Sequence, residues 1–379
     1  MRKVFYVTGT RADFGLMAST LQQIAAHPDL QLQVAVTGMH LSASYGLTVR
    51  DIEGLGLPIV ARIPTNVEDR TPAAMAQGIG EALVGLTQAM AQSRPDLALV
   101  IGDRGEMLAG AIAALHLGIP VVHLHGGERS GTVDEPVRHA ITKLSHWHFV
   151  ATEQSRERVI RLGERPEHVW ITGAPSLDGL AAQGAVPRAQ VLADLGLAAD
   201  ARFVLVLFHP VVQEMDDAYR QTAALAQALR ETLAASPTQI LWLAPNADAG
   251  SAAILRALDE VPIERLHRIT HLPRPLYVAA LRYAEALVGN SSSGIIEAAS
   301  FGTPVVNIGN RQRARERNRN TLDCAGDRPA IAAAIAQALA HGRYPAANVY
   351  GDGQAGARIT HLLATCALGA NLLDKVNTY

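Results

Sequence analysis

Short runs of β-branched and other apolar residues alternate with longer Ala- and Leu-rich stretches along most of this chain. That alternation is typical of parallel βαβ units. Several of the short runs, such as residues 97–102, are almost continuously apolar, as expected for strands that are covered on both faces. The pattern therefore predicts an α/β fold with parallel sheets.

The expected elements form two series separated by turn-forming residues. In the first series we expect strands at residues 3–8, 31–37, 97–102, 120–124, 148–152 and 168–172, and helices at 15–26, 72–92, 106–117 and 135–145. In the second we expect strands at 202–208, 239–243, 267–270, 285–289 and 304–308, and helices at 216–235, 252–258, 276–284, 293–301 and 328–340. Between them, around residues 175–200, Pro and Gly predict a linker.

The length of 379 residues fits two domains of this kind. We expect the first at residues 1–178 and the second at 190–355, with a last apolar helix at 356–379 that could pack on either. Ligands of such folds bind at the carboxyl ends of the strands. Two domains in tandem can place both of these edges along one cleft, which is where we expect the site.

Charge and composition exclude several classes of protein. Lys and Arg number 33 against 35 Asp and Glu, which argues against binding to nucleic acid or to an anionic membrane. The two cysteines are too few for a zinc ribbon or a disulfide framework. The apolar start is too short for a signal peptide, and no apolar run approaches the roughly 18–20 residues of a membrane span. These features favour a cytoplasmic protein.

The most specific local motif is Gly-Asn-Ser-Ser-Ser-Gly at residues 289–294, here called the serine loop, between an apolar strand and a helical stretch. Backbone N–H groups and hydroxyls at the start of a helix suit an anion. A helix N-cap without any ligand is the alternative. Glu297 follows at a position to accept a hydrogen bond from a ribose or sugar hydroxyl, and Arg311, after the next strand, suits bidentate phosphate binding.

Five arginines lie within residues 311–319. A solvated loop, a nucleic-acid patch and a mobile flap over the site are the three interpretations. Nucleic acid is the least favoured, because no aromatic residue is interleaved and the net charge is negative. We expect Arg311 to be functional and most of the other arginines to face solvent.

In the first domain, titratable residues follow successive strands. These residues are Asp103, His125, Glu128 and Asp134. Because they follow strand ends that meet at one edge of a sheet, they are candidates for acid/base catalysis. A helix cap or a surface charge is the alternative for any one of them. Arg11, after the first strand, could reach a phosphate or lie on the surface.

Metal binding is the other interpretation of the histidines. His123 and His125, and again His146 and His148, are spaced so that each pair shares one face of a strand. Zinc could use such a pair with Asp134 or Glu128, but no third ligand has a fixed spacing. We therefore expect no metal. In the second domain, His209, Asn246 and His271 follow three strands in turn, where they suit a phosphate, a sugar hydroxyl or a nucleobase edge.

Taken together, eight segments resemble the hydrolysing UDP-N-acetylglucosamine 2-epimerases of sialic-acid pathways. They are Gly-Thr-Arg-Ala-Asp at 9–13, Gly-Asp-Arg at 102–104, Gly-Gly-Glu at 126–128, Ser-Gly-Thr-Val-Asp at 130–134, Arg-His-Ala-Ile-Thr-Lys at 138–143, Phe-His-Pro at 208–210, the serine loop, and Gly-Thr-Pro-Val-Val-Asn at 302–307. The match runs in order over about residues 4–312 and is specific as a set.

The resemblance implies two Rossmann-like domains of the GT-B type that hold a UDP-sugar between them. It implies removal of the C2 proton, anti elimination of UDP to a 2-acetamidoglucal, and hydration to free N-acetylmannosamine, with neither metal nor nicotinamide. A homo-oligomer, dimer or tetramer, is expected. Asp103 and Asp134 match catalytic carboxylates. The implied UDP contacts are Arg11, His209, Ser291, Ser292, Glu297 and Arg311. We add their neighbours in the same motifs and strand ends as substrate-binding candidates: Arg104, Arg138, Asn246, His271, Ser293 and Gly294.

One position departs from the family. Where the mammalian and non-hydrolysing enzymes have a catalytic Glu, three residues before the position of Glu128, this chain has His125. Histidine can serve as acid or base near neutral pH. The change also suggests another sugar, the 6-deoxy-2,4-diacetamido sugar nucleotide of the legionaminic-acid pathway. A UDP-sugar-binding regulator without catalysis, and a GT-B glycosyltransferase, are the alternatives of other classes.

Overall fold

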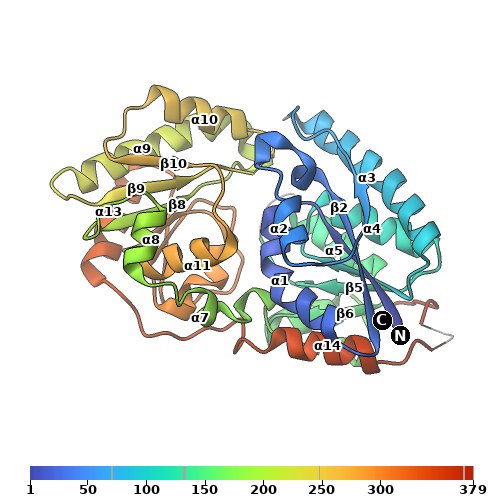
Figure 1. Cartoon of the computed structure of the whole chain (residues 1–379). Helices are drawn as coiled ribbons and strands as arrows, with labels where there is room; N and C mark the ends of the chain where they lie inside the picture. The colour runs from blue at the N-terminus through green and yellow to red at the C-terminus, as the bar shows by residue number, and fades with distance from the viewer. Residues whose placement is uncertain (70, 131–133, 247, 370–371, 379) are drawn as a thin grey trace. The chain divides into compact units, whose positions relative to one another are not determined.

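The computed structural model describes residues 1–69, 71–130, 134–246, 248–369 and 372–378 (Figure 1). Its contacts divide the chain into two units. The first unit consists of residues 1–128, 134–178 and 350–379, so far as these are described, and the second mainly of residues 179–349. Each unit is built around one parallel sheet, which confirms the predicted α/β class with two parallel sheets.

The first unit has a seven-stranded sheet in the order β3-β2-β1-β4-β5-β6-β7. Its strands are β1 (Arg2–Thr8), β2 (Leu30–Thr37), β3 (Ile59–Ile63), β4 (Leu97–Ile101), β5 (Val121–Leu124), β6 (Trp147–Val150) and β7 (Val169–Ile171). Its helices are α1 (Arg11–Ala26), α2 (Val49–Gly54), α3 (Pro72–Ser93), α4 (Gly105–His116), α5 (Asp134–Leu144), α6 (Glu153–Arg161) and α14 (Ala355–Thr365). Every residue of β4, β5 and β6 is buried, as the continuous apolar runs predict for central strands.

The second unit has a six-stranded sheet in the order β10-β9-β8-β11-β12-β13. Its strands are β8 (Phe203–Leu207), β9 (Gln239–Leu243), β10 (Leu266–Ile269), β11 (Leu287–Gly289), β12 (Val305–Ile308) and β13 (Thr321–Cys324). Its helices are α7 (Leu180–Gln183), α8 (Arg188–Asp194), α9 (Ala218–Leu233), α10 (Ser251–Glu260), α11 (Arg274–Tyr283), α12 (Ser292–Ile296) and α13 (Arg328–His341). The first six strands of the other sheet follow the same order, counted from β1, so both sheets are doubly wound in the same way.

The segment expected to be a linker is different in the structure. Residues 180–194 contain α7 and α8, which pack against α11 of the second unit. The final helix, α14, belongs to the first unit and packs against α1. The Asp178 carboxylate explains this placement, because it accepts hydrogen bonds from the backbone N–H groups of Ala355 and Gly356 at the start of α14.

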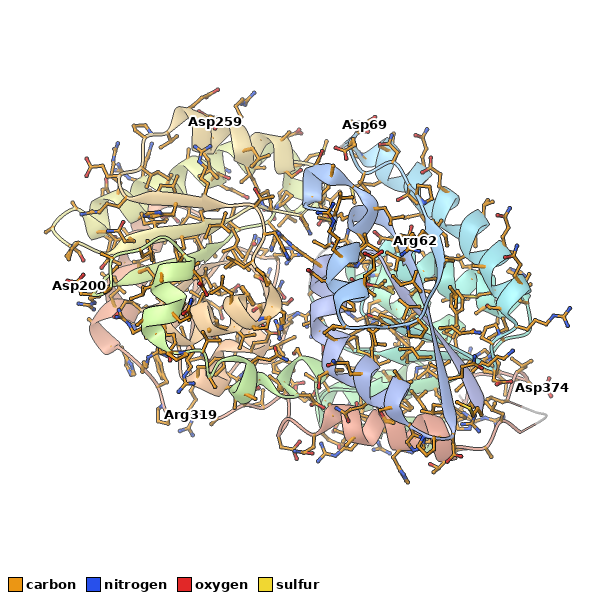
Figure 2. All side chains as sticks on the ribbon, viewed as in Figure 1. Arg62, Asp69, Asp200, Asp259, Arg319 and Asp374 are labelled. Atoms are coloured by element: carbon orange, nitrogen blue, oxygen red, sulfur yellow. The ribbon has the colours of Figure 1, made fainter. Side chains whose placement is uncertain are left out.

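Both sheets have a point where the strand order reverses, and ligands of such folds bind outside the carboxyl ends there. In the first unit this point lies between β1 and β4, and in the second between β8 and β11. At the end of β11, Gly289 has a φ of +144°, and an added Cβ would lie 1.9 Å from the Leu207 carbonyl oxygen. Only glycine fits this close approach of two strands. The charged side chains labelled in Figure 2, such as Asp69 and Arg319, are exposed.

Candidate functional site

Asp13 organises the loop that follows β1. Its carboxylate accepts hydrogen bonds from the backbone N–H groups of Gly9 and Thr10, at 3.0 and 2.9 Å, and Thr10 completes a capping box at the start of α1. Burial raises the pKa of this carboxyl. The result is a fixed first turn that carries Arg11 at the carboxyl end of β1.

Asp103 and Arg138 form an ion pair at the neighbouring strand end, after β4. Only 1% of the Arg138 side chain is exposed, and its guanidinium also donates to the Glu128 carbonyl oxygen at 3.0 Å. Arg138 therefore links two sequence-predicted catalytic residues and holds the Asp103 carboxylate in place. Arg104 lies beside them, with its Nε 3.4 Å from Glu106 Oε2.

His125 and Glu128 contact each other directly through Nδ1 and Oε1. Both side chains are buried, and His125 has a φ of +61°, which is unusual for a residue other than glycine. With an ionised Glu128, Nδ1 carries the proton and Nε2 becomes the acceptor. Strain of this kind clusters at functional sites because the surroundings must enforce it. Gly127 permits the same tight turn, since its Cβ would lie 2.2 Å from the Ser155 carbonyl oxygen.

His123 supports the loop that carries Asp103. Its Nε2 is 2.8 Å from the Gly102 carbonyl oxygen, and its Nδ1 is 3.1 Å from the Thr142 hydroxyl. Burial lowers its pKa to about 3, so the ring is neutral. In the same sheet, His146 accepts from the Val121 N–H. No group of three or more His, Cys, Asp or Glu in the described parts of the chain is arranged to hold a metal ion.

Asp134 is the first residue of α5, the helix that also carries Arg138. The preceding residues of the predicted Ser-Gly-Thr-Val-Asp motif, 131–133, lie outside the described residues. The first unit thus joins Asp103, Glu128, His125 and Arg138 in one set of contacts, with Asp134 one turn before Arg138.

In the second unit, Asn290 ties the serine loop to the end of β8. Its side-chain oxygen accepts from the His209 N–H, and its side-chain nitrogen donates to the His209 carbonyl oxygen, both at 2.8 Å. The His209 Nδ1 in turn accepts from the Asn246 N–H at 3.3 Å. Two sequence-predicted residues, His209 after β8 and Asn246 after β9, are therefore held beside the serine loop. The strand order β9-β8-β11 places the ends of these strands next to one another.

The helix after the serine loop is shorter than expected. The prediction of one helix over residues 293–301 is wrong in this respect, since α12 ends at Ile296 and a 3₁₀ turn, Ala298–Phe301, follows. Ser291 is its N-cap and Gly294 lies within it, so tightly packed that a Cβ would lie 2.7 Å from the Leu287 side chain. Ser292 and Ser293 are partly exposed.

Arg311 reaches the same loop from the end of β12. Its Nη1 donates to the Asn290 carbonyl oxygen at 3.2 Å, and Gln312 donates to the same oxygen at 3.1 Å. Of the later arginines in the run, Arg313 and Arg319 are exposed, while Arg317 is partly buried and pairs with Asp323. His271 lies, partly buried, in the turn between β10 and α11.

Glu297 is completely buried, and one of its partners, Arg274, is a residue that the sequence analysis missed. Arg274 donates to both of its carboxylate oxygens, at 2.7 and 3.1 Å, and Ser293 donates to one of them at 2.8 Å. Tyr277 contacts the Ser293 hydroxyl. No local signal marks Arg274, because it lies 23 residues from its partner and between two prolines that read as a turn.

The second unit also contains a cavity of about 270 Å³ near the ends of β8, β12 and β13. Phe208, Val211, Glu214, Asp217, Arg220, Gln221, Asn290, Ile308, Gly309, Asn310, Gly326 and Asp327 line it. Of the serine loop only Asn290 contributes, and none of the predicted substrate-binding side chains does. We therefore place the candidate site by its hydrogen-bonded residues and not by this cavity.

Comparison with known proteins gives a family match. The family model for UDP-N-acetylglucosamine 2-epimerase matches residues 22–364. A "UDP-N,N'-diacetylbacillosamine 2-epimerase (hydrolyzing)" of Legionella pneumophila is 45% identical over 380 residues, covering all of both chains. A "UDP-N-acetylglucosamine 2-epimerase" of Neisseria meningitidis is 32% identical, covering 93% of this chain and 92% of the relative. A "GDP/UDP-N,N'-diacetylbacillosamine 2-epimerase (hydrolyzing)" of Campylobacter jejuni is 31% identical, covering 85% and 84%.

Solved structures agree on the fold. UDP-GlcNAc 2-epimerase of Neisseria meningitidis bound to UDP-GlcNAc has a TM-score of 0.80 at 19% identity, covering 95% of this chain and 99% of its own. The enzyme of Methanocaldococcus jannaschii in complex with UDP-GlcNAc and UDP has a TM-score of 0.80 at 18% identity, with the same coverage. No helix among the described residues is long and apolar enough to cross a membrane.

Proposed function

Because the chain belongs to the UDP-N-acetylglucosamine 2-epimerase family and is a hydrolysing enzyme of this type, we propose that it releases UDP and a C2-inverted 2-acetamido sugar from a UDP-sugar. The observation that carries the proposal is the set of contacts in the first unit in which Arg138 joins Asp103 to the His125–Glu128 pair. Two acid/base groups in fixed positions are what successive proton transfers need.

The proposed reaction has two stages. A base takes the proton from C2, the C1–O bond to UDP breaks with its electrons going to the leaving diphosphate, and a C1=C2 double bond forms. Water then adds, with its hydroxyl at C1 and a proton at C2 on the opposite face. His125 Nε2 suits one proton transfer, because the contact of Nδ1 with Glu128 keeps the proton on Nδ1 and leaves Nε2 as the acceptor. Asp103 and Asp134 are the proposed carboxylates for the others.

The nucleotide is the proposed ligand of the second unit. His209, Asn246 and Arg311 are held at the strand ends by hydrogen bonds to the serine loop or to one another. Cationic and N–H groups there would bind the negatively charged diphosphate. We propose the following residues as contacts of the UDP-sugar: Arg11, Arg104, His209, Asn246, His271, Ser291, Ser292, Ser293, Gly294 and Arg311. Arg138 is proposed to act through Asp103, and Glu297 through Ser293.

For the sugar, we propose the UDP-linked 2,4-diacetamido-2,4,6-trideoxyhexose ahead of UDP-GlcNAc. The relative named for the diacetamido substrate is 45% identical over its whole length, against 32% for the Neisseria relative named for UDP-N-acetylglucosamine. His125 supports the same choice, because this chain departs there from the Glu of the mammalian and non-hydrolysing enzymes. The chemistry at C1 and C2 is the same for both sugars.

The test is a side-by-side incubation of both sugar nucleotides in D₂O. We expect free UDP from the diacetamido substrate, and a released sugar that carries deuterium at C2. Faster turnover of UDP-GlcNAc would reverse the order of the two sugars. Formation of a UDP-linked epimer without free UDP would indicate the non-hydrolysing reaction. Tight UDP binding without turnover of either sugar would indicate a regulator, and a need for an acceptor without C2 exchange would indicate a glycosyltransferase.

A further inference from the structure

The last described segment of the chain, residues 372–378, here called the tail, packs on the first unit. Leu372 lies against the hydrophobic core of that unit, and the backbone N–H of Thr378 donates to the Gly163 carbonyl oxygen at 3.1 Å. Where the tail meets Glu164, the cavity between them is only about 20 Å³, which is room for about one water molecule. The tail therefore fits closely against the rest of the unit.

Lys375 anchors the tail to a buried carboxylate. Its Nζ lies 2.7 Å from Glu164 Oε2, and only 4% of the Glu164 side chain is exposed. Lys143 of α5 pairs with Oε1 of the same carboxylate, also at 2.7 Å, and His148 Nε2 lies 2.9 Å from Oε2. Since Glu164 would keep Lys143 and His148 as partners, loss of the Lys375 charge would not leave a buried carboxylate alone.

The Lys375 ammonium group also caps the C-terminal end of α5. It donates to the carbonyl oxygens of Thr142, at 3.1 Å, and of Ser145. The last carbonyl groups of a helix have no partner within it, and a cation there also interacts favourably with the helix dipole. Together with Glu164, these contacts use all three donors of the ammonium group. Lys375 therefore fixes the end of the helix that carries Arg138.

Thr142 joins this end of α5 to both loops of the proposed catalytic set. Its hydroxyl oxygen is 3.1 Å from His123 Nδ1, and His123 Nε2 is 2.8 Å from the carbonyl oxygen just before Asp103. A Cβ added to Gly126, in the turn that begins at His125, would lie 3.1 Å from the same hydroxyl oxygen. A displacement of the end of α5 would therefore reach both loops.

We propose that Lys375 is a positioning residue for the proton transfers, which holds the end of α5 and thereby keeps Arg138 and Asp103 in place. The inference rests on the proposed UDP-sugar epimerase function. Arg138 is buried and pairs with Asp103, so a shift of α5 would move the carboxylate as well. A displacement of 1 Å that starts far from the reacting atoms can lower a rate by about 10²-fold. The nucleotide is proposed to bind mainly through the second unit, so its affinity should not depend on the tail.

The experiment compares Lys375→Met with the wild-type full-length protein, by turnover of both sugar nucleotides and by calorimetry with UDP. We expect kcat to fall about tenfold while UDP affinity stays within twofold. Lys375→Arg should recover part of the loss, since a guanidinium can still pair with Glu164 and donate to a carbonyl oxygen. Thr142→Val removes the hydroxyl beside His123 and should also lower kcat. The double variant should lose less than the product of the two single losses, because both act through the end of α5.

Two controls separate positioning from stability. Asp374→Asn is the control within the tail, because Asp374 is exposed (Figure 2), and it should leave kcat unchanged. Thr71→Ala is the control for stability, because it removes the N-cap of α3 in the same unit. It should lower Tm but keep kcat within twofold when turnover is measured well below Tm.

Near-normal kcat in folded Lys375→Met would overturn the inference, as would a loss of UDP affinity as large as the loss of kcat. An equal fall of kcat in Thr71→Ala would also overturn it, because reduced stability alone would then explain both variants. Wild-type protein that binds UDP but turns over neither sugar would refute the proposed function. Normal turnover by both the wild type and Lys375→Met would instead refute the inference alone.

Discussion

The two sheets share one strand order, but the groups at their reversal points are of different kinds. In the first unit, acid/base side chains gather at this point and after the next strand, including the Asp103–Arg138 pair and the His125–Glu128 contact. In the second, the corresponding place between β8 and β11 is built from amide and backbone groups, with Asn290 joined to His209 by two hydrogen bonds. One topology therefore supports two kinds of site, since function is set by the residues at the strand ends.

The units also differ in where their histidines lie. The first unit buries His40, His123, His125, His146 and His148, while its other histidines, His27, His116, His139, His168 and His361, are partly or fully exposed. His209, His267, His271 and His341 in the second unit are partly or fully exposed. Buried imidazoles must remain neutral or find a partner, so the first unit carries an electrostatic load from buried histidines that the second lacks. If this comparison is correct, the first unit performs the proton transfers and the second binds the nucleotide.

The sharpest way to break the comparison is to remove the carboxylate of Asp103. Asp103→Asn should lower kcat by about 10³-fold or more, the size expected for an acid/base group, because an amide cannot exchange a proton. UDP affinity should stay within twofold, since the nucleotide is proposed to bind mainly through the second unit. The measurement is UDP release under saturating substrate, with UDP binding by calorimetry. Asp69→Asn, an exposed carboxylate of the same unit (Figure 2), is the control.

A near-normal kcat in Asp103→Asn would remove this residue from the reaction. A loss of UDP affinity as large as the loss of kcat would instead show that the first unit binds the nucleotide as well. Either result would end the simple division between the two units.

The second prediction is that mild acid destabilises the first unit more than the second. Burial lowers the pKa of His123 to about 3 and of His146 to about 4, against 6.5 for a free imidazole. Below pH 6.5 the unfolded chain binds protons that the folded one does not, so stability falls as the pH drops towards the folded values. From pH 7.5 to 5 we expect a loss of about 2 kcal/mol from His123. Burial also lowers the pKa of His148, which acts in the same direction.

Hydrogen exchange at pH 7.5 and pH 5, compared after correction for the intrinsic rates, is the measurement. The backbone amides of β5 and β6 should become less protected from exchange at pH 5, while the protection of those of β8 and β9 should change little. His146→Gln keeps an acceptor for the Val121 N–H and should flatten the pH dependence, whereas His267→Gln, in the second unit, should not. Glu164, whose pKa His148 and the neighbouring lysines hold at about 2 despite its burial, contributes only below pH 4.5 and so does not interfere. Equal loss of protection in both sheets would contradict the comparison.

The sequence predicts the central strands well, because strands buried on both faces must be apolar along their whole length. It misses β3 and β13, two of the four edge strands, where Arg62 and Asp323 interrupt the apolar pattern and residues are partly exposed. It also misses α6, whose sequence is mostly polar and which is fixed by packing on β6 and β7. Local periodicity carries no information about such tertiary support.

The candidate residues show the same limit. Asp103, His125, His209 and the serine loop are found because loops after parallel strands meet at one edge. The pairing of these groups with their partners is not predicted. That Arg138 pairs with Asp103, 35 residues earlier, and that Arg274 pairs with Glu297 depends on how helices pack, which no spacing rule supplies. Sequence therefore finds the strand-end groups, but it does not show which buried residues pair with them and orient them.

The smallest expected effect concerns Arg311, and it sharpens the role of the second unit. Arg311→Ala should weaken UDP binding about tenfold, the order of one hydrogen bond to a charged group, which is about 1.4 kcal/mol. The serine loop should keep its place, because Gln312 still donates to the Asn290 carbonyl oxygen. Since the guanidinium is proposed to bind the diphosphate in substrate and transition state alike, KM should rise and kcat should change little. Arg319→Ala, an exposed residue of the same run (Figure 2), should change neither value. A kcat that falls as far as affinity would show that Arg311 acts mainly on the departing diphosphate, and the second unit would then share in the chemistry.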